Sequence, residues 1–286
     1  MVNKQKIGLI TDDICSLPEK IINDYQIELV KTKLFFPEWE KFPEKNLYQL
    51  MAETKAYPKT SAPSPGEYLK AYKKVLENFE EVLVITLSSE LSACYNSAFQ
   101  AREFFGDPSR IFLFDSQVAV AAQGLLIIKA AELIREGKEI KDVIKILEKL
   151  RKNVKIFGFL KTTFWVEKIG RITHLQATAF KILKGLGIQP YIGFKNGKVG
   201  LTGFNFWTVY TLEALFNQLK HQSRKGEIRV GINYTDNIDL AYKLKEKIEK
   251  ELKSEVVFIS LVPPIVGANS GPGTLIAGCY QFNSFE

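Results

Sequence analysis

Hydroxyl side chains gather in two short segments in the first third of the chain. TSAPSP begins at Thr60 and SSELSACYNSA begins at Ser88, which makes Thr60, Ser61, Ser89 and Ser92 candidate donors. Ser92 also stands just before an expected helix, and the free N–H groups at a helix start attract negative charge. Single Ser and Thr residues more often cap helices and turns. The two clusters together favour a site for an anion.

Serine catalysis is disfavoured because it needs a base beside the reacting hydroxyl. The chain has two histidines, His174 and His221, and neither lies in an expected strand-end loop of the first half. The nucleophile-elbow pattern G-x-S-x-G is also absent. We therefore expect no catalytic residue among the serines.

Four other polar residues lie where a ligand could reach them. Asp12 follows the first expected strand, although a solvated acid or a cap is the commoner role of such a residue. The segment GANSGPG, residues 267–273, carries Asn269 and Ser270 and could bring N–H groups close to an anion or form an ordinary turn. Arg171 could place a cation beside the site or pair with a surface carboxylate.

The first half alternates short apolar runs with amphipathic stretches, which is typical of a parallel sheet covered by helices. Loops at the carboxyl ends of such strands converge on one crevice, where Thr60 and Ser92 could meet. S-x-x-E boxes at Ser16 and Ser64 predict helix starts, and Gly137 predicts a helix end. The expected strands cover residues 6–11, 28–36, 81–87 and 111–114, and the main expected helices cover residues 94–104, 119–136 and 138–152.

The second half begins near Lys155 and is richer in aromatic residues and turns. Its pattern is typical of a mixed sheet with helices on one face. The expected elements are a helix over residues 172–184, a hairpin turn at 195–198, a helix capped by Asp236 and ending at 253, and a strand over 255–261.

The predicted fold class is α/β, with a Rossmann-like parallel-sheet domain over residues 1–157 and a smaller mixed-sheet α/β domain over residues 158–286. The chain has 286 residues, of which 46% are hydrophobic and 12% aromatic, with 20 Phe. This composition can fill a large core and still line an apolar cavity.

The charge pattern does not favour a nucleic-acid partner, although the net charge is +7 and the pI is about 9.1. Only seven of the 39 basic residues are Arg, and the lysines lie among glutamates, as on a solvated helix face. The three cysteines form no CxxC pair, so neither a metal site nor a disulfide framework is expected. No window resembles a signal peptide or a membrane span, which predicts a cytoplasmic protein without stable membrane insertion.

Six motifs follow one another along almost the full length of the chain. They are, in order, ITDDICSLP, KTSAPSPGEY, LSSELSACYNSA, FDSQVAVAAQGLL, EKIGRITHLQATAFKILKGLGIQP and VGANSGPGTLIAG. In these motifs and their order the chain resembles the DegV family of fatty-acid-binding proteins. The resemblance implies a parallel α/β domain joined to a smaller mixed α/β domain, with an acyl chain held between or within them. It also implies that Thr60 and Ser92 contact the carboxylate, with Ser61 and Ser89 close by.

Two departures from the family pattern concern the ligand's head group. The family's final loop usually reads His-Thr-Gly-Pro-Gly, whereas this chain has Asn269 and Ser270 in the first two places. Asn can donate a hydrogen bond but cannot shuttle a proton. Members that hand their fatty acid to a kinase subunit commonly carry arginines after the segment matching KNGKV, and this chain has none between Arg171 and Arg224.

The expected function is binding of a long-chain fatty acid without chemistry and without another cofactor, as a carrier that could serve a fatty-acid kinase subunit. The alternative is a small-molecule kinase or transferase domain of the dihydroxyacetone-kinase type, holding a phosphorylated ligand. It is disfavoured because the site loops hold no histidine for covalent attachment and the chain has no P-loop motif. A third reading, a lipid-sensing regulatory protein, has no discriminating motif.

Overall fold

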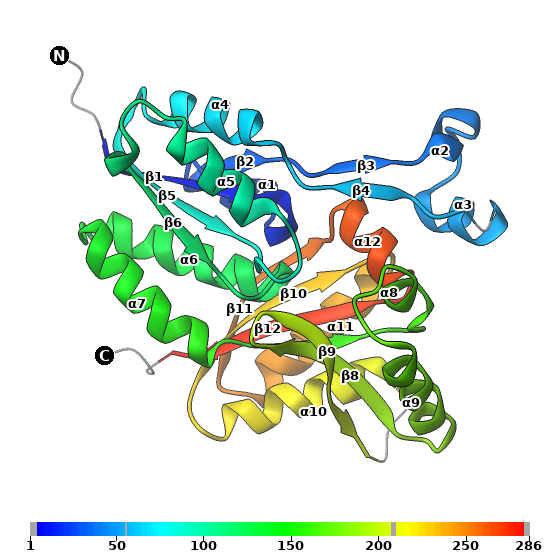
Figure 1. Ribbon diagram of the computed structural model, residues 1–286. Coiled ribbons are helices and arrows are strands. Elements are labelled where there is room, and N and C mark those ends of the chain that lie inside the picture. The colour runs from blue at the N-terminus through cyan, green and yellow to red at the C-terminus, as the bar shows by residue number, and fades with distance from the viewer. Residues whose placement is uncertain (1–4, 55, 207–209, 283–286) are drawn as a thin grey trace.

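The computed structural model describes residues 5–54, 56–206 and 210–282. Figure 1 shows two main sheets stacked with helices above, between and below them, and a two-stranded ribbon that extends to one side. The α/β prediction, with one parallel and one mixed sheet, is confirmed. The boundary predicted at residues 157 and 158 falls inside β7 (Lys155–Phe159), which pairs only with strands of the mixed sheet among the described residues.

The parallel sheet has four strands in the order β2-β1-β5-β6. Its centre is apolar on both faces, since Val82, Leu83, Val84 and Ile85 of β5 are fully buried. The strands are β1 (Gln5–Asp12), β2 (Glu28–Val30), β5 (Phe79–Thr86) and β6 (Ile111–Asp115). The helices of this half are α1 (Glu19–Asp24), α4 (Pro65–Val75), α5 (Cys94–Glu103), α6 (Val120–Arg135) and α7 (Ile140–Asn153), with 3-10 turns η1 (Asp13–Cys15) and η2 (Pro108–Arg110).

The strand predicted over residues 28–36 is in fact two strands in different sheets. β2 ends at Val30, and β3 (Lys33–Phe35) leaves the parallel sheet to pair with β4 (Lys59–Ser61). At the break, the N–H of Thr32 donates to the Asp13 carboxylate at 2.9 Å. That side-chain acceptor replaces a partner in the sheet and lets the chain turn away.

Of the two predicted capping boxes, one is confirmed and one is wrong. Glu67 accepts from both the backbone N–H and the hydroxyl of Ser64, at 2.7 and 2.8 Å, at the start of α4. Ser16 instead ends η1 in a left-handed conformation, and α1 begins after Pro18. A proline with a fixed φ can start a helix without a side-chain cap. Gly137, with a φ of +79°, follows α6 as predicted.

The mixed sheet has six described strands in the order β11-β10-β12-β7-β8-β9, in which β10 and β11 pair in parallel and the other neighbours pair antiparallel. The hairpin turn predicted at residues 195–198 is confirmed, with Asn196 and Gly197 both at positive φ. Besides β7, the strands are β8 (Gln189–Lys195), β9 (Lys198–Asn205), β10 (Ile228–Tyr234), β11 (Ser254–Leu261) and β12 (Leu275–Gln281).

Helices cover both faces of the mixed sheet, so the prediction of helices on one face is wrong. α10 (Thr211–Ser223) and α11 (Ile238–Glu251) lie on the outer face, while α6 packs on the inner face (Figure 1). The approach of α6 is close: a Cβ added at Gly278 would lie 2.6 Å from the backbone N of Ala122. Only glycine fits there. Asn237, and not Asp236, caps α11, because its side-chain oxygen accepts a hydrogen bond from the Leu240 N–H.

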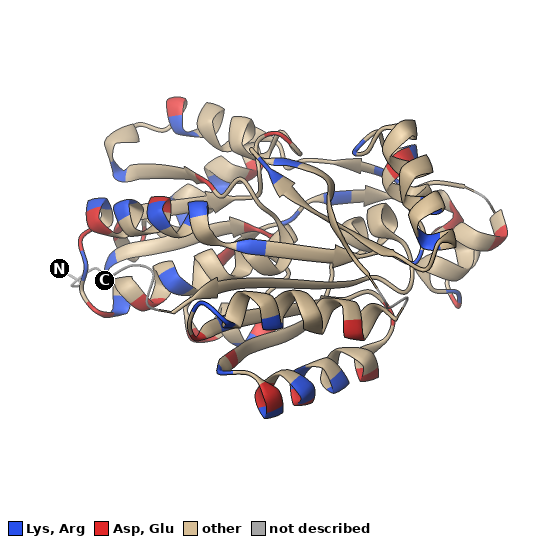
Figure 2. Ribbon diagram, turned by 90° about the horizontal axis from the view of Figure 1, so that it is seen from below, with Lys and Arg blue, Asp and Glu red and all other residues tan. Residues whose placement is uncertain are grey.

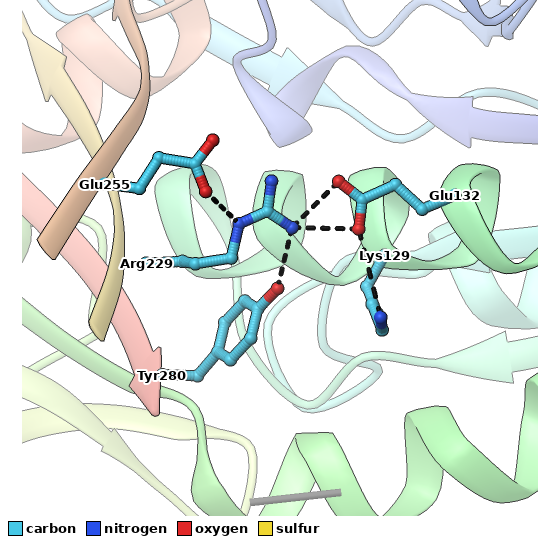
Figure 3. A network of polar contacts seen from close by, with 5 residues as sticks. All are labelled: Lys129, Glu132, Arg229, Glu255 and Tyr280. Carbon is cyan, nitrogen blue, oxygen red and sulfur yellow. Dashed lines mark hydrogen bonds and ion pairs between the residues drawn. The ribbon is translucent and has the colours of Figure 1, made fainter. Parts of the chain in front are cut away.

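An ion-pair network ties α6 to the mixed sheet (Figure 3). Arg229 of β10 donates to Glu132 of α6 at 2.8 Å, to Glu255 of β11 at 2.7 Å and to the Tyr280 hydroxyl of β12 at 3.1 Å. Lys129 lies 4.0 Å from Glu132. Because Arg229 is only 7% exposed, these partners offset the cost of burying its charge.

Five short helices complete the fold around the two sheets. The predicted glycine-rich loop is partly helical, because its residues 267–270 form the end of α12. Gly271 follows with a φ of +80°, and a Cβ there would lie 2.1 Å from the Trp165 ring, so this turn requires glycine. The five helices are α2 (Pro37–Lys41), α3 (Leu47–Thr54), α8 (Phe164–Lys168), α9 (His174–Gly185) and α12 (Pro264–Ser270).

Charges of both signs are interspersed over the helices of the face drawn in Figure 2. Within the described ranges, no helix has the length and apolar character needed to cross a bilayer. The same residues contain no cluster of His, Cys, Asp or Glu arranged to hold a metal ion.

Candidate functional site

A cavity of about 310 Å³ is lined by the mixed sheet, by strand β4 of the ribbon and by segments that follow strands of the parallel sheet. Its lining is mostly aliphatic, with a few polar groups, as in sites for small organic ligands. Six of the eight candidate polar residues line it, namely Thr60, Ser61, Ser92, Arg171, Asn269 and Ser270. The structure therefore brings together residues that are separated by more than two hundred positions in the sequence.

Thr60 and Ser61 lie on β4, in the two-stranded ribbon and not in a loop of the parallel sheet. Both residues are exposed at the cavity. Among the described residues, no side-chain hydrogen bond occupies either hydroxyl. Each hydroxyl is thus available to donate to a ligand.

Ser92 approaches the cavity from the segment between β5 and α5. Its Oγ lies 3.2 Å from the Sγ of Cys94 and 3.4 Å from the Cys94 N–H. The contact to the N–H is long and a thiol is a weak hydrogen-bond partner, so the hydroxyl can exchange them for a stronger acceptor. Burial raises the pKa of the Cys94 thiol to about 12, which keeps it neutral beside an anion.

Asn269 enters the cavity from α12, and Tyr57 fixes its side chain. The Tyr57 hydroxyl donates to Oδ1 of Asn269 at 2.5 Å, so the amide NH₂ remains as the donor for a ligand. Burial raises the pKa of Tyr57 to about 12, which preserves this donor role at neutral pH. The neighbouring Ser270 donates its hydroxyl to the Val266 carbonyl at 2.8 Å and has no second proton to offer.

Arg171 supplies the one charged side chain among the described residues that line the cavity. It follows α8, is exposed, and has no carboxylate within ion-pair distance in the described ranges. The structure thus favours the first of the two sequence alternatives, a cation beside the site. An unpaired guanidinium can attract and orient an anionic head group.

Asp12 and Ser89 do not belong to the cavity lining. Ser89 donates its hydroxyl to Asp115 at 2.6 Å. Asp12 is fully buried and accepts from the Leu87 N–H at 2.8 Å and from Gln123 at 3.1 Å. Burial outweighs these bonds and raises the pKa of Asp12 to about 7.

The sequence predicted an apolar cavity but did not identify the individual apolar residues that line it. Val120, at the start of α6, is one such residue, and its φ of +46° is unusual for a β-branched side chain. The only sequence signal is the excess of aliphatic residues at segment ends, which also fits an ordinary core. The principal aliphatic residues are Ile14, Leu87, Leu91, Val120, Ile156, Val166, Ile169, Ile192, Val199, Ile265, Val266 and Ile276.

The arrangement suits binding better than acid–base or nucleophilic chemistry. Among the described lining residues there is no His, Cys, Asp or Glu. The hydroxyls of Thr60 and Ser92 have no base beside them that would activate them. The described lining thus consists of hydrogen-bond donors, one of them the cation Arg171, beside a mostly aliphatic surface.

Comparisons with known proteins agree with this architecture. The sequence model of the DegV family, described as uncharacterised proteins, matches residues 6–280. Protein DegV of Bacillus subtilis is 26% identical over 288 residues, which cover 96% of this chain and 99% of that protein. A DegV-domain-containing protein of Staphylococcus aureus is 27% identical over 284 residues, or 96% of each chain.

Two solved structures from Thermotoga maritima are similar over nearly the whole chain. One, described as revealing a fatty acid binding function, has a TM-score of 0.80 and 26% identity, and the match covers 97% of this chain and 100% of that one. The other, described as a DegV lipid-binding protein, has a TM-score of 0.79 and 26% identity, with 97% and 99% covered. With the family model matched from residue 6 to residue 280, the chain belongs to the DegV family.

Proposed function

We propose that this protein binds one long-chain fatty acid, with the acyl tail in the aliphatic cavity and the carboxylate at its polar group of donors. The observation that carries the proposal is the convergence of Thr60, Ser92, Arg171 and Asn269 on one otherwise aliphatic cavity. The relatives described as binding fatty acid or lipid support the same ligand class.

Tail burial supplies most of the expected affinity. Each methylene removed from water contributes about 0.8 kcal/mol, so a tail of roughly sixteen carbons offers on the order of 10 kcal/mol before association costs. The aliphatic lining can receive such a tail without leaving polar groups unpaired.

The polar donors orient the ligand. A carboxylate buried without donors would cost several kcal/mol. The hydroxyls of Thr60 and Ser92, the amide of Asn269 and the guanidinium of Arg171 offer donors of three chemical types, and charge-assisted hydrogen bonds are stronger than neutral ones. The head group would therefore face Thr60 and Ser92 while the tail extends between β7, β8 and α12.

A carrier role toward a fatty-acid kinase subunit is the finer form of this proposal. The carboxylate would have to stay accessible at Thr60 and Ser61, which are both exposed. Asn269 offers a donor but no titratable proton, so the chain is suited to holding the carboxylate and less suited to assisting its phosphorylation. We assign no reaction to the chain alone.

The test uses delipidated protein, a saturated sixteen-carbon fatty acid and calorimetry. Thr60→Val and Ser92→Ala should each weaken binding by about tenfold, because each removes a hydrogen bond to a charged acceptor. Both variants should keep the fold, since neither hydroxyl supports the core. Native mass spectrometry of the freshly purified protein should show one added acyl mass.

Ser89→Ala is the matched control, because its hydroxyl is bound to Asp115 and lies outside the cavity lining. It should leave the affinity unchanged. Equal affinity for the native protein and a Thr60→Val/Ser92→Ala double variant would show that the carboxylate binds elsewhere.

A further inference from the structure

A second cavity, of about 620 Å³, lies at the start of β7 and the end of β8 in the mixed sheet and is lined by consecutive residues of both strands. It is bordered by the end of α7, the β8–β9 hairpin and α10, and its size suits a small organic ligand. Five of its lining residues are basic, and among the described lining residues none is acidic. The basic residues are Arg151, Lys152, Lys155, Lys195 and His221.

Three of these cations lack counter-charges. Lys152, Lys155 and Lys195 are exposed, and within the described ranges none has a carboxylate within 4.0 Å, whereas the neighbouring Lys198 pairs with Glu90 at 3.4 Å. Like charges held close together destabilise one another. A bound anion would relieve this repulsion, and the cavity offers it a concave surface.

The fourth cation is held in place by the protein. Arg151 donates to the Asp115 carbonyl at 2.8 Å, and its guanidinium lies 5.1 Å from the centre of the Phe114 ring. This bond uses one of five N–H donors, so a rigid guanidinium with spare donors borders the cavity. Rigid donors bind an anion with a smaller loss of entropy than free side chains do.

Amide side chains add neutral donors to the same lining. Gln117, Gln218 and Gln222 line it, although the Gln218 amide already donates one bond to Asn205 at 2.9 Å and Gln222 contacts His221 at 3.4 Å. Gln117 holds a left-handed backbone with a φ of +55°. Such a backbone is uncommon for a residue other than Gly, Asn or Asp, and it often marks a functional site. Mixed cationic and amide donors match the oxygens of a phosphate group.

The cavity is separate from the fatty-acid site but shares part of its wall. Ile156 of β7 and Phe194 of β8 line both cavities. A hydrogen bond from the Ser88 hydroxyl to the Gly197 carbonyl, at 2.7 Å, links the segment after β5 to the hairpin that borders the second cavity. The two sites are therefore neighbours with different chemistry.

We propose that the second cavity is an anion-binding site for a small ligand that carries one or two phosphate groups. Lys152, Lys155 and Lys195 would contact the phosphate oxygens, with Arg151 as the fixed donor. Phe157 and Tyr191, which also line the cavity, would face any organic part of the ligand. The phosphate could belong to a soluble metabolite or to a lipid head group.

The experiment measures binding of inorganic pyrophosphate by calorimetry at low ionic strength, where screening is weak. A triple variant, Lys152→Gln/Lys155→Gln/Lys195→Gln, should weaken binding by at least roughly tenfold, because contacts to charged acceptors are lost. The matched control, Lys138→Gln/Lys141→Gln/Lys243→Gln, removes three exposed lysines outside the cavity lining and should bind as the native protein does. Thermal melting of all three proteins checks that the fold is retained.

A parallel arm replaces pyrophosphate with vesicles that contain phosphatidic acid. Pyrophosphate binding that the triple variant loses supports the site with a soluble source of phosphate. Vesicle binding alone, lost in the triple variant and kept in the control, supports it with a lipid head group as the source. Absence of binding to both probes, or an equal loss in the triple variant and the control, would overturn the proposal.

Discussion

The two cavities that β7 and β8 help to line differ in almost every chemical respect, although Ile156 and Phe194 belong to both. The first is mostly aliphatic, and Arg171 is the one cation among its described lining residues. The second has five basic side chains and several amides, with no acidic residue among its described lining. One pair of strands can therefore serve two kinds of ligand.

The difference also indicates where binding energy comes from in each cavity. In the first, affinity should scale with the length of tail buried and depend little on salt. In the second, affinity should rest on charge and fall as salt screens it. Variants that affect one cavity and spare the other therefore test whether the two are independent.

The largest effect is expected from filling the first cavity. Val266 of α12 is half-buried and lines it, so Val266→Trp would place a bulky ring where the tail lies. If the ring keeps four methylenes of the tail in water, the binding free energy of the fatty acid weakens by about 3 kcal/mol. Calorimetry should then show an affinity lower by roughly a hundredfold. Pyrophosphate binding should stay unchanged.

Ile238→Trp serves as the comparison, because Ile238 is exposed at the start of α11 and lines neither cavity. It should bind fatty acid as the native protein does. A native affinity in Val266→Trp would mean that the tail does not pass α12.

A smaller effect is expected when the first cavity receives a titratable side chain in addition to Arg171. Asn269→His should change fatty-acid affinity by less than about tenfold, because the tail still dominates and a donor remains. With ATP and a fatty-acid kinase subunit, the loaded variant should form acyl phosphate faster than the native protein, since transfer depends on exact placement of the carboxylate. Robust transfer by the native protein, with no gain in the variant, would contradict this reasoning.

Asp12→Asn should have the smallest effect on ligands, because Asp12 lines neither cavity. Its effect should appear in the way the free energy of unfolding depends on pH. The pKa of Asp12 is raised to about 7 in the folded protein, so between pH 4 and 7 the folded state keeps a proton that the unfolded state has lost. This group therefore stabilises the fold at low pH, and that contribution is lost as the pH rises to about 7.

Urea unfolding between pH 4.5 and 8 measures the slope of the free energy of unfolding against pH. Asp12→Asn should remove a pH-dependent difference on the order of a few kcal/mol. In this variant the Asn oxygen can still accept from the Leu87 N–H. Its NH₂ faces the Nε2 of Gln123, so the Gln123 amide has to flip and present its Oε1, which lacks a partner in the described ranges, as the acceptor. Asp24→Asn, at an exposed position, removes the same charge as a control; an unaltered slope in Asp12→Asn would contradict the assignment.

The sequence predicted the fold class well because periodicity and turn chemistry are local. Strand β5 reads as an apolar run, and the turn at Asn196 and Gly197 follows from positive φ at both residues. The single strand predicted over residues 28–36 was wrong because apolar residues lie on both sides of the break and no Gly or Pro marks it. Only the distant contact from Thr32 to Asp13 shows where the chain leaves the sheet.

The polar residues of the candidate site could be predicted where they cluster in the sequence. The contacts that free or occupy each side chain could not, because they depend on how distant segments pack together. Thr60, Ser92 and Asn269 stand out by type, and they do line one cavity. Ser89 is of the same type, yet Asp115 occupies its hydroxyl, and no local signal distinguishes the two cases. The role of Tyr57 in orienting Asn269 joins residues far apart in sequence, so it required the structure.

Helix α6 has a consequence for folding cooperativity. Twelve of its sixteen residues are buried, it packs against strands of both sheets, and Arg229 ties it to the mixed sheet. Unfolding of either sheet would uncover one side of this helix. The energetic cost of exposing α6 is thus shared by both halves of the chain, so the two sheets should lose structure in one transition, and amides of α6 should be among the last to exchange with solvent.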